Sequence, residues 1–269
     1  MAKTKGLPAP SDNSFALITG ASQGIGKAMA FDLAKRGYNT ILVARREEVL
    51  ETVAAQLREL GAVSEVFAAD LSKPADVDRL IEHMAGREIS IIINSAGIAS
   101  FGKFMDQDWD YETNQFALNA EAVHRLTRAA LEQMLPRRKG AICNVGSAAG
   151  NVPIPNNATY VFTKAGVNAF TEALHYELKR SGISCTLLAP GPVREAVVPE
   201  EEQSIVDKVV PDFFWTTYES CSKETLEAME RNQRRVVPGP LGKAMNLAGL
   251  VLPTALTAPL IGSFYAKMG

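Results

Sequence analysis

Short apolar runs alternate along the chain with longer stretches whose apolar residues recur every three to four positions. The runs are apolar almost throughout, which is typical of strands buried on both faces. They are FALIT (15–19), TILVA (40–44), EVFAA (65–69), SIIIN (90–94), AICNV (141–145) and SCTLLA (184–189). The longer stretches predict helices at 26–37, 47–61, 74–86, about 108 to 136 and about 158 to 181. This alternation predicts an α/β fold, a single doubly wound parallel sheet with right-handed crossovers and helices on both faces.

Length and composition agree with that fold and narrow the class of function. A chain of 269 residues, 46% hydrophobic and 22% charged, suits one large globular domain. The net charge of −2 and the lack of a basic block exclude a nucleic-acid surface. The three histidines lie on separate predicted helices without ligand-like spacing, so we expect no metal.

Cysteine usage and the first residues indicate the compartment. Cys143, Cys185 and Cys221 are odd in number and far apart, which argues against a disulfide framework and for a reducing environment. Residues 1–13 lack the apolar core of a secretory signal, and we interpret them as a flexible leader. We therefore expect a cytoplasmic protein.

A glycine-rich turn follows the first predicted strand. In TGASQGIG (19–26), Gly20, Gly24 and Gly26 permit a tight turn, close backbone approach to a pyrophosphate, and entry into a helix whose first amides face that phosphate. The alternative is a glycine-rich turn without a ligand. Its place at the first strand-to-helix junction favours a dinucleotide site.

The ends of the second and third strands indicate which dinucleotide binds. An NAD site usually has Asp or Glu after the second strand, but this chain has Arg45 and Arg46 there. A guanidinium fork suits a 2′-phosphate, so we expect NADPH/NADP+; the alternative is that both arginines lie in solvent beside the next helix. Asp70 and Leu71 end the third strand, where they would contact the adenine edge, although Asp70 could equally be a turn residue.

A Tyr-x-x-x-Lys pair lies on the last long predicted helix of the core. The spacing of Tyr160 and Lys164 puts both side chains on one helical face. An ammonium beside a phenol favours the phenolate, so we expect Lys164 to lower the pKa of Tyr160 and make it a proton donor and acceptor. Ser147 follows a strand and is a candidate to hold a substrate carbonyl. Asn119 lies within a helix, where its amide could bind a local backbone carbonyl or a water and extend a proton relay to Lys164.

These motifs occur together in the order and at the spacing of the short-chain dehydrogenase/reductase family. They are TGASQGIG, NSAG (94–97), Asn119, Ser147, YVFTK (160–164) and PGPV (190–193). The chain resembles this family over roughly residues 14 to 195, which implies a Rossmann-type NADP-binding and catalytic core. The resemblance implies a catalytic tetrad of Asn119, Ser147, Tyr160 and Lys164. It also implies a cofactor site lined by Gly20, Ser22, Ile25, Asn94, Ala96, Gly97, Pro190, Gly191 and Val193, with Lys164 holding the nicotinamide ribose.

The reaction implied by this resemblance is the reduction of a ketone by NADPH. Ser147 and Tyr160 would hydrogen-bond the oxygen, Tyr160 would deliver the proton, and Asn119 with water would resupply it. Two positions depart from the family pattern. Ser95 stands where Asn is common, and Arg194 stands where a Thr commonly contacts the nicotinamide carboxamide. Arg194 would instead face solvent or an anionic group of the substrate.

The family pattern ends near residue 195. The usual glycine-rich final strand is missing, and RRVVPGP (234–240) is a candidate for a short replacement. We expect residues 196–269 to form a substrate loop or lid and an atypical helical, apolar C-terminal extension, packed on the same domain. Phe213, Phe214 and Trp215 fall where this fold places its substrate loop. They would line an acyl channel or form the core of a small lid.

A narrower resemblance covers nearly the whole chain. It is to the mycolate-reducing branch of the family in actinobacteria, which reduces the 3-oxo group of an α-branched, very long-chain acyl product. Its segments are VPIPNNATY (152–160), LLAPGPVRE (187–195), VVPDFFW (209–215), MERNQRRVVPGP (229–240) and GSFYAKMG (262–269). The alternatives are a smaller ketone, steroid or carrier-bound substrate, and a non-catalytic NADPH-binding protein. The resemblance further implies a homodimer paired through the long helices after the fourth and fifth strands.

Residues 244–266 carry no charge. The stretch is long enough to span a bilayer, but Pro253 and Pro259 interrupt it, so we do not expect a span. Two interpretations stay open. The stretch packs as helix over the substrate cleft or against a second subunit, or it docks at the inner face of the plasma membrane, where a lipid substrate would be found.

Overall fold

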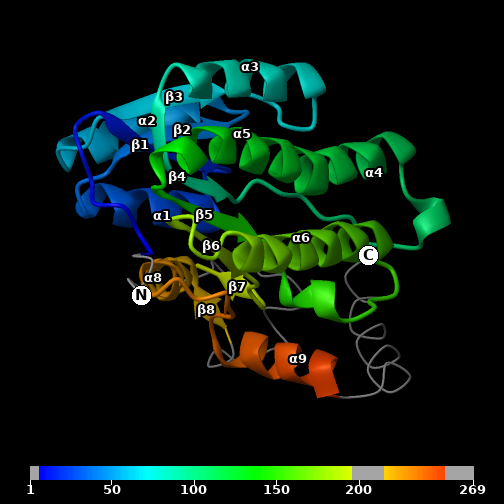
Figure 1. Ribbon diagram of the computed structural model, residues 1–269. Helices are drawn as coiled ribbons and strands as arrows, with labels where there is room; N and C mark the ends of the chain where they lie inside the picture. The colour runs from blue at the N-terminus through cyan, green and yellow to red at the C-terminus, as the bar shows by residue number, and fades with distance from the viewer. Residues whose placement is uncertain (1–5, 196–214, 252–269) are drawn as a thin grey trace.

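A parallel sheet forms the centre of the computed structural model, which describes residues 6–195 and 215–251. Within those residues, seven strands pair in the order β3-β2-β1-β4-β5-β6-β9 (Figure 1). The order reverses between β1 and β4, so a crevice opens at the carboxyl ends of these two strands. The strands are β1 (Ser14–Thr19), β2 (Asn39–Ala44), β3 (Ser64–Ala68), β4 (Glu88–Asn94), β5 (Gly140–Val145), β6 (Ile183–Leu188) and β9 (Arg235–Val236).

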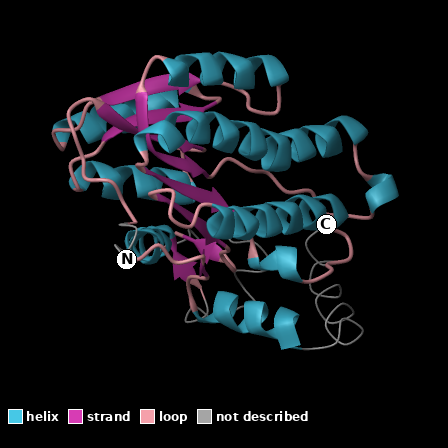
Figure 2. Ribbon diagram, in the orientation of Figure 1, coloured by secondary structure: helices cyan, strands magenta, loops and turns pink. Residues whose placement is uncertain are grey.

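Helices cover both faces of the sheet, and Figure 2 shows the resulting layers. One face carries α1 (Gly24–Lys35), α2 (Glu47–Glu59) and α8 (Tyr218–Glu230). The other carries α3 (Pro74–Ala85), α5 (Ala122–Arg137) and α6 (Ala158–Glu177). The remaining elements are η1 (Phe104–Asp106), α4 (Trp109–Phe116), η2 (Ala117–Glu121), η3 (Ala148–Asn151), β7 (Val193–Arg194), β8 (Thr216–Thr217) and α9 (Pro240–Val251).

The core contains two large apolar clusters, one on each face of the sheet. In β1, Ala16 and Ile18 join the cluster beneath α1, α2 and α8, whereas Phe15 and Leu17 join the cluster beneath α3 and α5. Alternate residues of a strand point to opposite faces, so a run that is apolar throughout is buried on both sides. The predicted fold class, a doubly wound parallel sheet, is confirmed.

The predicted helix at about 108 to 136 is interrupted. It consists of α4, a π-helical turn (η2) and α5. Asn119 lies inside the π turn and is fully buried. A π turn widens the helix locally, which is a common feature of functional sites.

The residues before β1 differ from the flexible leader that we expected. From Gly6 onwards they lie against the core, because the Tyr38 hydroxyl donates to Pro8 O (2.5 Å) and the Ser184 hydroxyl donates to Gly6 O (2.6 Å). Leu7 packs against the cluster beneath α1 and α8. These contacts hold the segment to β2 and β6.

The C-terminal part of the described chain extends the domain. β9 pairs in parallel with β6, through Leu187 with Arg235 and Leu188 with Val236, so the short last strand predicted from RRVVPGP is confirmed. Within the expected helical extension lies α8, which packs against α1. Phe213, Phe214 and residues 252–266 lie outside the described residues. Among the described helices, we find none long and apolar enough to cross a membrane.

Candidate active site

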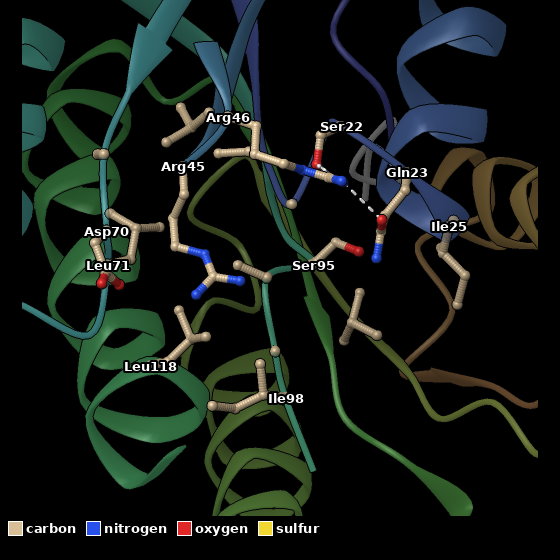
Figure 3. Close-up of a pocket in the computed structure, with 18 of the residues that line it drawn as sticks. Ser22, Gln23, Ile25, Arg45, Arg46, Asp70, Leu71, Ser95, Ile98 and Leu118 are labelled. Atoms are coloured by element: carbon tan, nitrogen blue, oxygen red, sulfur yellow. Dashed lines mark hydrogen bonds between the residues drawn. The ribbon is translucent and has the colours of Figure 1, made fainter. Parts of the chain in front are cut away.

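A cleft of about 530 Å³ lies at the carboxyl ends of β1 to β4 (Figure 3). The glycine-rich turn forms one wall. Gly20 and Gly24 have φ of +70° and +60°, values that favour glycine, and a Cβ on Gly20 would lie 2.9 Å from Ala96 N. A Cβ on Gly26 would lie 2.5 Å from Gly20 O. The turn therefore needs glycine for its own packing, and Ser22 and Ile25 complete this wall.

The first turn of α1 opens towards this cleft. Gln23 immediately precedes the helix, and its side chain accepts a hydrogen bond from Arg46 (2.7 Å) instead of capping the helix. The first backbone amides of a helix lack partners within the helix and attract anions. The glycine turn and these amides together fit a pyrophosphate.

Arg45 and Arg46 both line the cleft, as the NADP expectation requires. Figure 3 shows the two side chains lying across it, with Arg46 directed at Ser22 and Gln23. Their positive charge lies beside the glycine turn, so a phosphate on the adenosine ribose would meet two guanidinium groups. Among the described residues that line the cleft, Arg45 and Arg46 are the positively charged ones.

Asp70 is a turn residue as well as a cleft residue. Its Oδ1 accepts from the backbone N (3.1 Å) and the hydroxyl (2.8 Å) of Ser72, which shapes the turn that ends β3. Leu71 is buried beside it and lines the same cleft. The interpretation of Asp70 as a turn residue is therefore confirmed, and its contact with adenine stays a prediction.

Residues 94–97 comprise the last residue of β4 and the first three residues after it, and they have different roles. Ser95, Ala96 and Gly97 line the cleft, and the Thr19 hydroxyl accepts hydrogen bonds from the amides of Ser95 and Ala96, both at 3.0 Å. Asn94 is buried instead, and its amide donates to Asn144 (2.8 Å) and Thr127 (3.1 Å). Asn94 thus supports the strand end from beneath.

Pro190, Gly191 and Val193 follow the carboxyl end of β6. They are not among the residues that line the cleft. Pro190 O accepts from Ala148 N (2.9 Å), which ties this segment to the residue after Ser147. Arg194 faces the Trp215 ring and not only solvent. The central carbon of its guanidinium lies 4.7 Å from the centroid of that ring. Trp215 therefore packs on the strand pair β7–β8.

The side chains of the expected tetrad come together beside the cleft. The Ser147 side chain lies close enough to the Tyr160 hydroxyl to lower its pKa. Lys164 Nζ donates to Val145 O (2.8 Å), and Val145 lines the cleft. A Cβ on Gly97 would lie 3.1 Å from Asn119 Oδ1 and 3.4 Å from Lys164 Nζ, so Gly97 fits between these two groups. The tetrad thus adjoins the cleft through two of its lining residues.

Asn119 uses both ends of its amide to hold a loop. Its Nδ2 donates to Ile98 O (2.8 Å) and to the Thr163 hydroxyl (3.2 Å), and its Oδ1 accepts from Ile98 N (3.0 Å). The expectation of a local backbone carbonyl is wrong, since Ile98 belongs to the loop after β4. The amide reaches that loop because the π turn directs it out of the regular helical ladder.

Burial sets the pKa values of the pair on α6. Burial raises the pKa of Tyr160, and the Ser147 side chain offsets only part of that rise. Burial lowers the pKa of Lys164 to about 8. The expected lowering of the Tyr160 pKa by Lys164 is therefore not found. The ammonium lies 5.7 Å from the Tyr160 ring centroid and donates to Val145 O instead.

Two further residues belong to the site but were not predicted. Asn168 is buried, accepts from Ser147 N (3.3 Å) and donates to Ser147 O (2.9 Å). It lies one turn after Lys164 on the face of Tyr160, so helical periodicity could have indicated it. Tyr218 lines the cleft from α8, and no motif of the core points to it.

Comparisons with known proteins agree with this geometry. A family model described as short chain dehydrogenase matches residues 14–205. The chain is 37% identical over 190 residues to a very-long-chain 3-oxoacyl-CoA reductase of Anas platyrhynchos, covering 67% of this chain and 60% of that protein. It is 36% identical over 193 residues to 17-beta-hydroxysteroid dehydrogenase type 3 of Mus musculus, covering 69% and 63%. The chain thus spans about three fifths of the length of these relatives.

Solved structures share the fold over most of the chain. A short-chain dehydrogenase from Sphingobium yanoikuyae, in complex with NADPH, has a TM-score of 0.78 at 32% identity, covering 88% of this chain and 92% of that one. A structure of 7beta-hydroxysteroid dehydrogenase has a TM-score of 0.84 at 25% identity, covering 93% and 96%.

The chain belongs to the short-chain dehydrogenase family. The relative from Sphingobium yanoikuyae holds NADPH, the cofactor that the sequence leads us to expect here.

Proposed function

We propose that this protein uses NADPH to reduce the 3-oxo group of a long-chain, α-branched acyl lipid of the mycolate type to a 3-hydroxyl. One observation carries the reaction. The Ser147 side chain lies close enough to the Tyr160 hydroxyl to lower its pKa, and Lys164 lies buried one helical turn away, beside a glycine-rich cleft with two arginines.

We propose that NADPH binds along the described cleft and reaches Lys164 beside it. The turn of Gly20, Gly24 and Gly26 would hold the pyrophosphate, and Arg45 and Arg46 would hold the 2′-phosphate. Asp70 and Leu71 would border the adenine, and Lys164 would hold the nicotinamide ribose. Bound NADPH would supply the hydride for the carbonyl carbon.

Tyr160 is the proposed proton donor. Its raised pKa keeps the phenol protonated at neutral pH, so it gives up its proton as negative charge develops on the carbonyl oxygen. Ser147 would donate a hydrogen bond to that oxygen, and Asn168 fixes the Ser147 backbone for this purpose. Lys164, with a pKa of about 8, is mainly cationic at neutral pH and would stabilise the phenolate.

In this mechanism Asn119 holds other residues in place. Its hydrogen bonds hold Ile98, and with it Gly97, against α6. The proposed relay of protons through its side chain is less well supported, because both ends of the amide are engaged. We propose Asn119 as a positioning residue that holds the cleft in its place relative to Lys164.

The substrate class rests on the sequence resemblance and on one relative. A very-long-chain 3-oxoacyl-CoA reductase matches this chain at 37% identity, which supports a long acyl chain carrying a 3-oxo group. α9, where the uncharged stretch 244–266 begins, lies beside η3, which directly follows Ser147. We propose that this stretch serves the lipid, as a wall of its channel or as a dock on the membrane.

A steroid or smaller ketone is the second candidate. The relatives named 17-beta-hydroxysteroid dehydrogenase type 3 and 7beta-hydroxysteroid dehydrogenase support it at similar identity. A rigid ring system would need the same Ser147 and Tyr160 geometry. The two candidates differ in the channel, so only a comparison of substrates separates them.

The first test compares substrates in detergent. NADPH oxidation would be followed with an α-branched, long-chain 3-oxo ester, a short-chain 3-oxo ester and a 17-oxo steroid. We expect the long ester to give the highest kcat/KM. Better turnover of the steroid or of the short ester would replace the proposed lipid substrate with the second candidate.

The second test removes the proposed proton donor. Tyr160→Phe keeps the ring and its packing but removes the hydroxyl, so we expect kcat to fall by about two to four orders of magnitude while NADPH affinity stays within about twofold. Cofactor affinity would be measured by fluorescence titration. Unchanged turnover would show that Tyr160 is not the donor.

A further inference from the structure

The segment that begins α8 is fixed at the carboxyl edge of the sheet. Thr216 and Thr217 pair with Val193 and Arg194, just after β6. The Thr217 hydroxyl then caps α8 by accepting a hydrogen bond from Ser220 N (3.1 Å). Tyr218, the first residue of α8, is thus held next to the cleft by a strand pair on one side and a helix cap on the other.

Tyr218 lies over the glycine turn. Its ring atoms Cε1 and Cζ lie 3.6 and 3.8 Å from where a Cβ on Gly24 would be, which is van der Waals contact. The ring lines the same cleft as Ser22 and Arg46. Any side chain at position 24 would thus meet the ring, in addition to the strain of its positive φ.

α8 cannot easily move away from this position. It packs along α1, where Cys221, Leu226 and Met229 are fully buried against the cluster that holds Met29 and Leu33. The Ser222 hydroxyl also donates to Asp32 Oδ2 (2.7 Å). The ring of Tyr218 and the turn at the start of α1 therefore form one rigid wall.

We infer that Tyr218 is a cofactor-binding residue that covers the pyrophosphate of NADPH and comes from outside the family-matched residues 14–205. The inference rests on the proposed use of this cleft for NADPH. An aromatic ring over the glycine turn removes water from the phosphate and its backbone donors, and hydrogen bonds to a charged group are stronger where water is excluded. The cofactor site would then extend into the C-terminal part of the chain.

This role makes a distinct prediction about cofactor choice. The pyrophosphate is common to NADPH and NADH, so Tyr218→Ala should weaken both by a similar factor, about tenfold. Arg46→Ala should weaken NADPH much more than NADH, because only NADPH carries the 2′-phosphate. Tyr218→Phe keeps the ring and loses only the hydroxyl. If the ring acts by shielding the pyrophosphate from water, this variant should retain most of the affinity for both cofactors.

The test is fluorescence titration of the whole chain with NADPH and NADH. Tyr176→Ala is the matched control, because Tyr176 is 52% exposed on α6 and does not line the cleft. Melting without cofactor checks folding, and Tyr218→Ala and Tyr176→Ala should melt alike. The inference is overturned if Tyr218→Ala binds both cofactors as the wild type does, or if it loses NADPH alone.

The outcomes also separate this inference from the proposed reaction. If the wild type binds NADPH but reduces none of the offered ketones, the proposed reaction fails, and the role of Tyr218 in binding is still decided by the titration. If the wild type reduces the long ester and Tyr218→Ala binds both cofactors normally, the reaction stands and the inference fails.

Discussion

At Tyr160 and Lys164, burial outweighs the attraction between opposite charges. An exposed pair at this spacing would favour the phenolate. Here both groups lose water, which raises one pKa and lowers the other to about 8. The result is a neutral phenol beside an ammonium that titrates in the working range of an enzyme.

The lowered pKa of Lys164 predicts how stability and activity depend on pH. Below about pH 8 the amine is charged in both the folded and the unfolded chain. Between there and about 10.4, where an exposed lysine titrates, the unfolded chain binds more protons, so this group adds stability as pH rises. Lys164→Met removes that dependence. In urea unfolding, the free energy of unfolding of the variant minus that of the wild type should fall from pH 7 to pH 10.

Activity gives an independent check of the same group. The wild-type kcat should decline above about pH 8, as the ammonium that stabilises the phenolate is lost. A profile that is flat through this range, together with a stability difference that does not change with pH, would contradict a buried Lys164 with a lowered pKa.

The residues that form this part of the site could be predicted from the sequence, but the directions of their pKa shifts could not. The spacing of Tyr160 and Lys164 predicted one shared helical face, and the structure brings Ser147 to it. The directions of the pKa shifts depend on burial and on Val145 O, which only the packing of β5 under α6 supplies. Asn168 shares the periodicity of the pair and was still missed, because its partner is the backbone of Ser147.

At the scale of elements, α4 completes the start of α6. Asn157 precedes α6 but donates its amide to Ser100 O, and the first turn of α6 contains no acidic residue. Glu112 of α4, only 3% exposed, accepts a hydrogen bond from the Thr159 hydroxyl in that turn. A carboxylate at a helix N-terminus is stabilising, and here it comes from a neighbouring helix.

Glu112→Ala should therefore destabilise the protein. Losing a hydrogen bond to a buried charged group costs about 1.5–3 kcal/mol, measured as the change in the free energy of unfolding in urea. Because Thr159 adjoins Tyr160, kcat should fall as well. The control is Glu132→Ala, whose partner Arg128 is exposed on α5, and which should change stability by less than about 1 kcal/mol. Equal effects of the two variants would rule out this role.

The helices were predictable as periodic segments, whereas their interruption was not. The apolar pattern of 108 to 136 predicts one helix. Within the π turn, Asn119 makes hydrogen bonds to Ile98, a residue far away in sequence. A local pattern carries no information about such a partner.

At the scale of the whole molecule, a polar cluster joins the C-terminal segment to the core. Arg235 of β9 donates to Glu172 of α6 (2.9 Å) and to Asn246 of α9 (2.7 Å). Asn246 in turn accepts from Asn151 of η3 (2.9 Å). The side chains of Arg235 and Glu172 are 14% and 20% exposed, so water screens this pair only weakly.

Arg235→Ala should loosen this junction. The variant leaves Glu172 and Asn246 without their shared donor, and we expect a loss of about 2–3 kcal/mol in the free energy of unfolding. Hydrogen exchange should show the loss centred on β9 and α9. Arg231→Ala, which removes an exposed pair with Glu227, should cost less than about 1 kcal/mol. Uniform exchange across the sheet would contradict a local junction.

The parallel sheet could be predicted from the sequence as far as β6, because each strand hides both faces, whereas the order of its strands comes from the structure. β9 was predicted from RRVVPGP alone, but its register was not, since it depends on Arg235 meeting residues on three other elements. The packed segment from Gly6 onwards was also missed. Its contacts are made by backbone carbonyls, which residue types do not reveal.

The π turn at Ala117–Glu121 rotates α4 relative to α5 about the helix axis. A single added residue rotates the helix on its N-terminal side by about 100° relative to the helix on its C-terminal side. With that offset, α5 keeps its apolar side on the sheet while α4 turns Glu112 towards α6. Deleting one residue here would restore a regular helix and break both alignments together. Insertions and deletions in this short stretch should therefore be far less tolerated than substitutions on its exposed side.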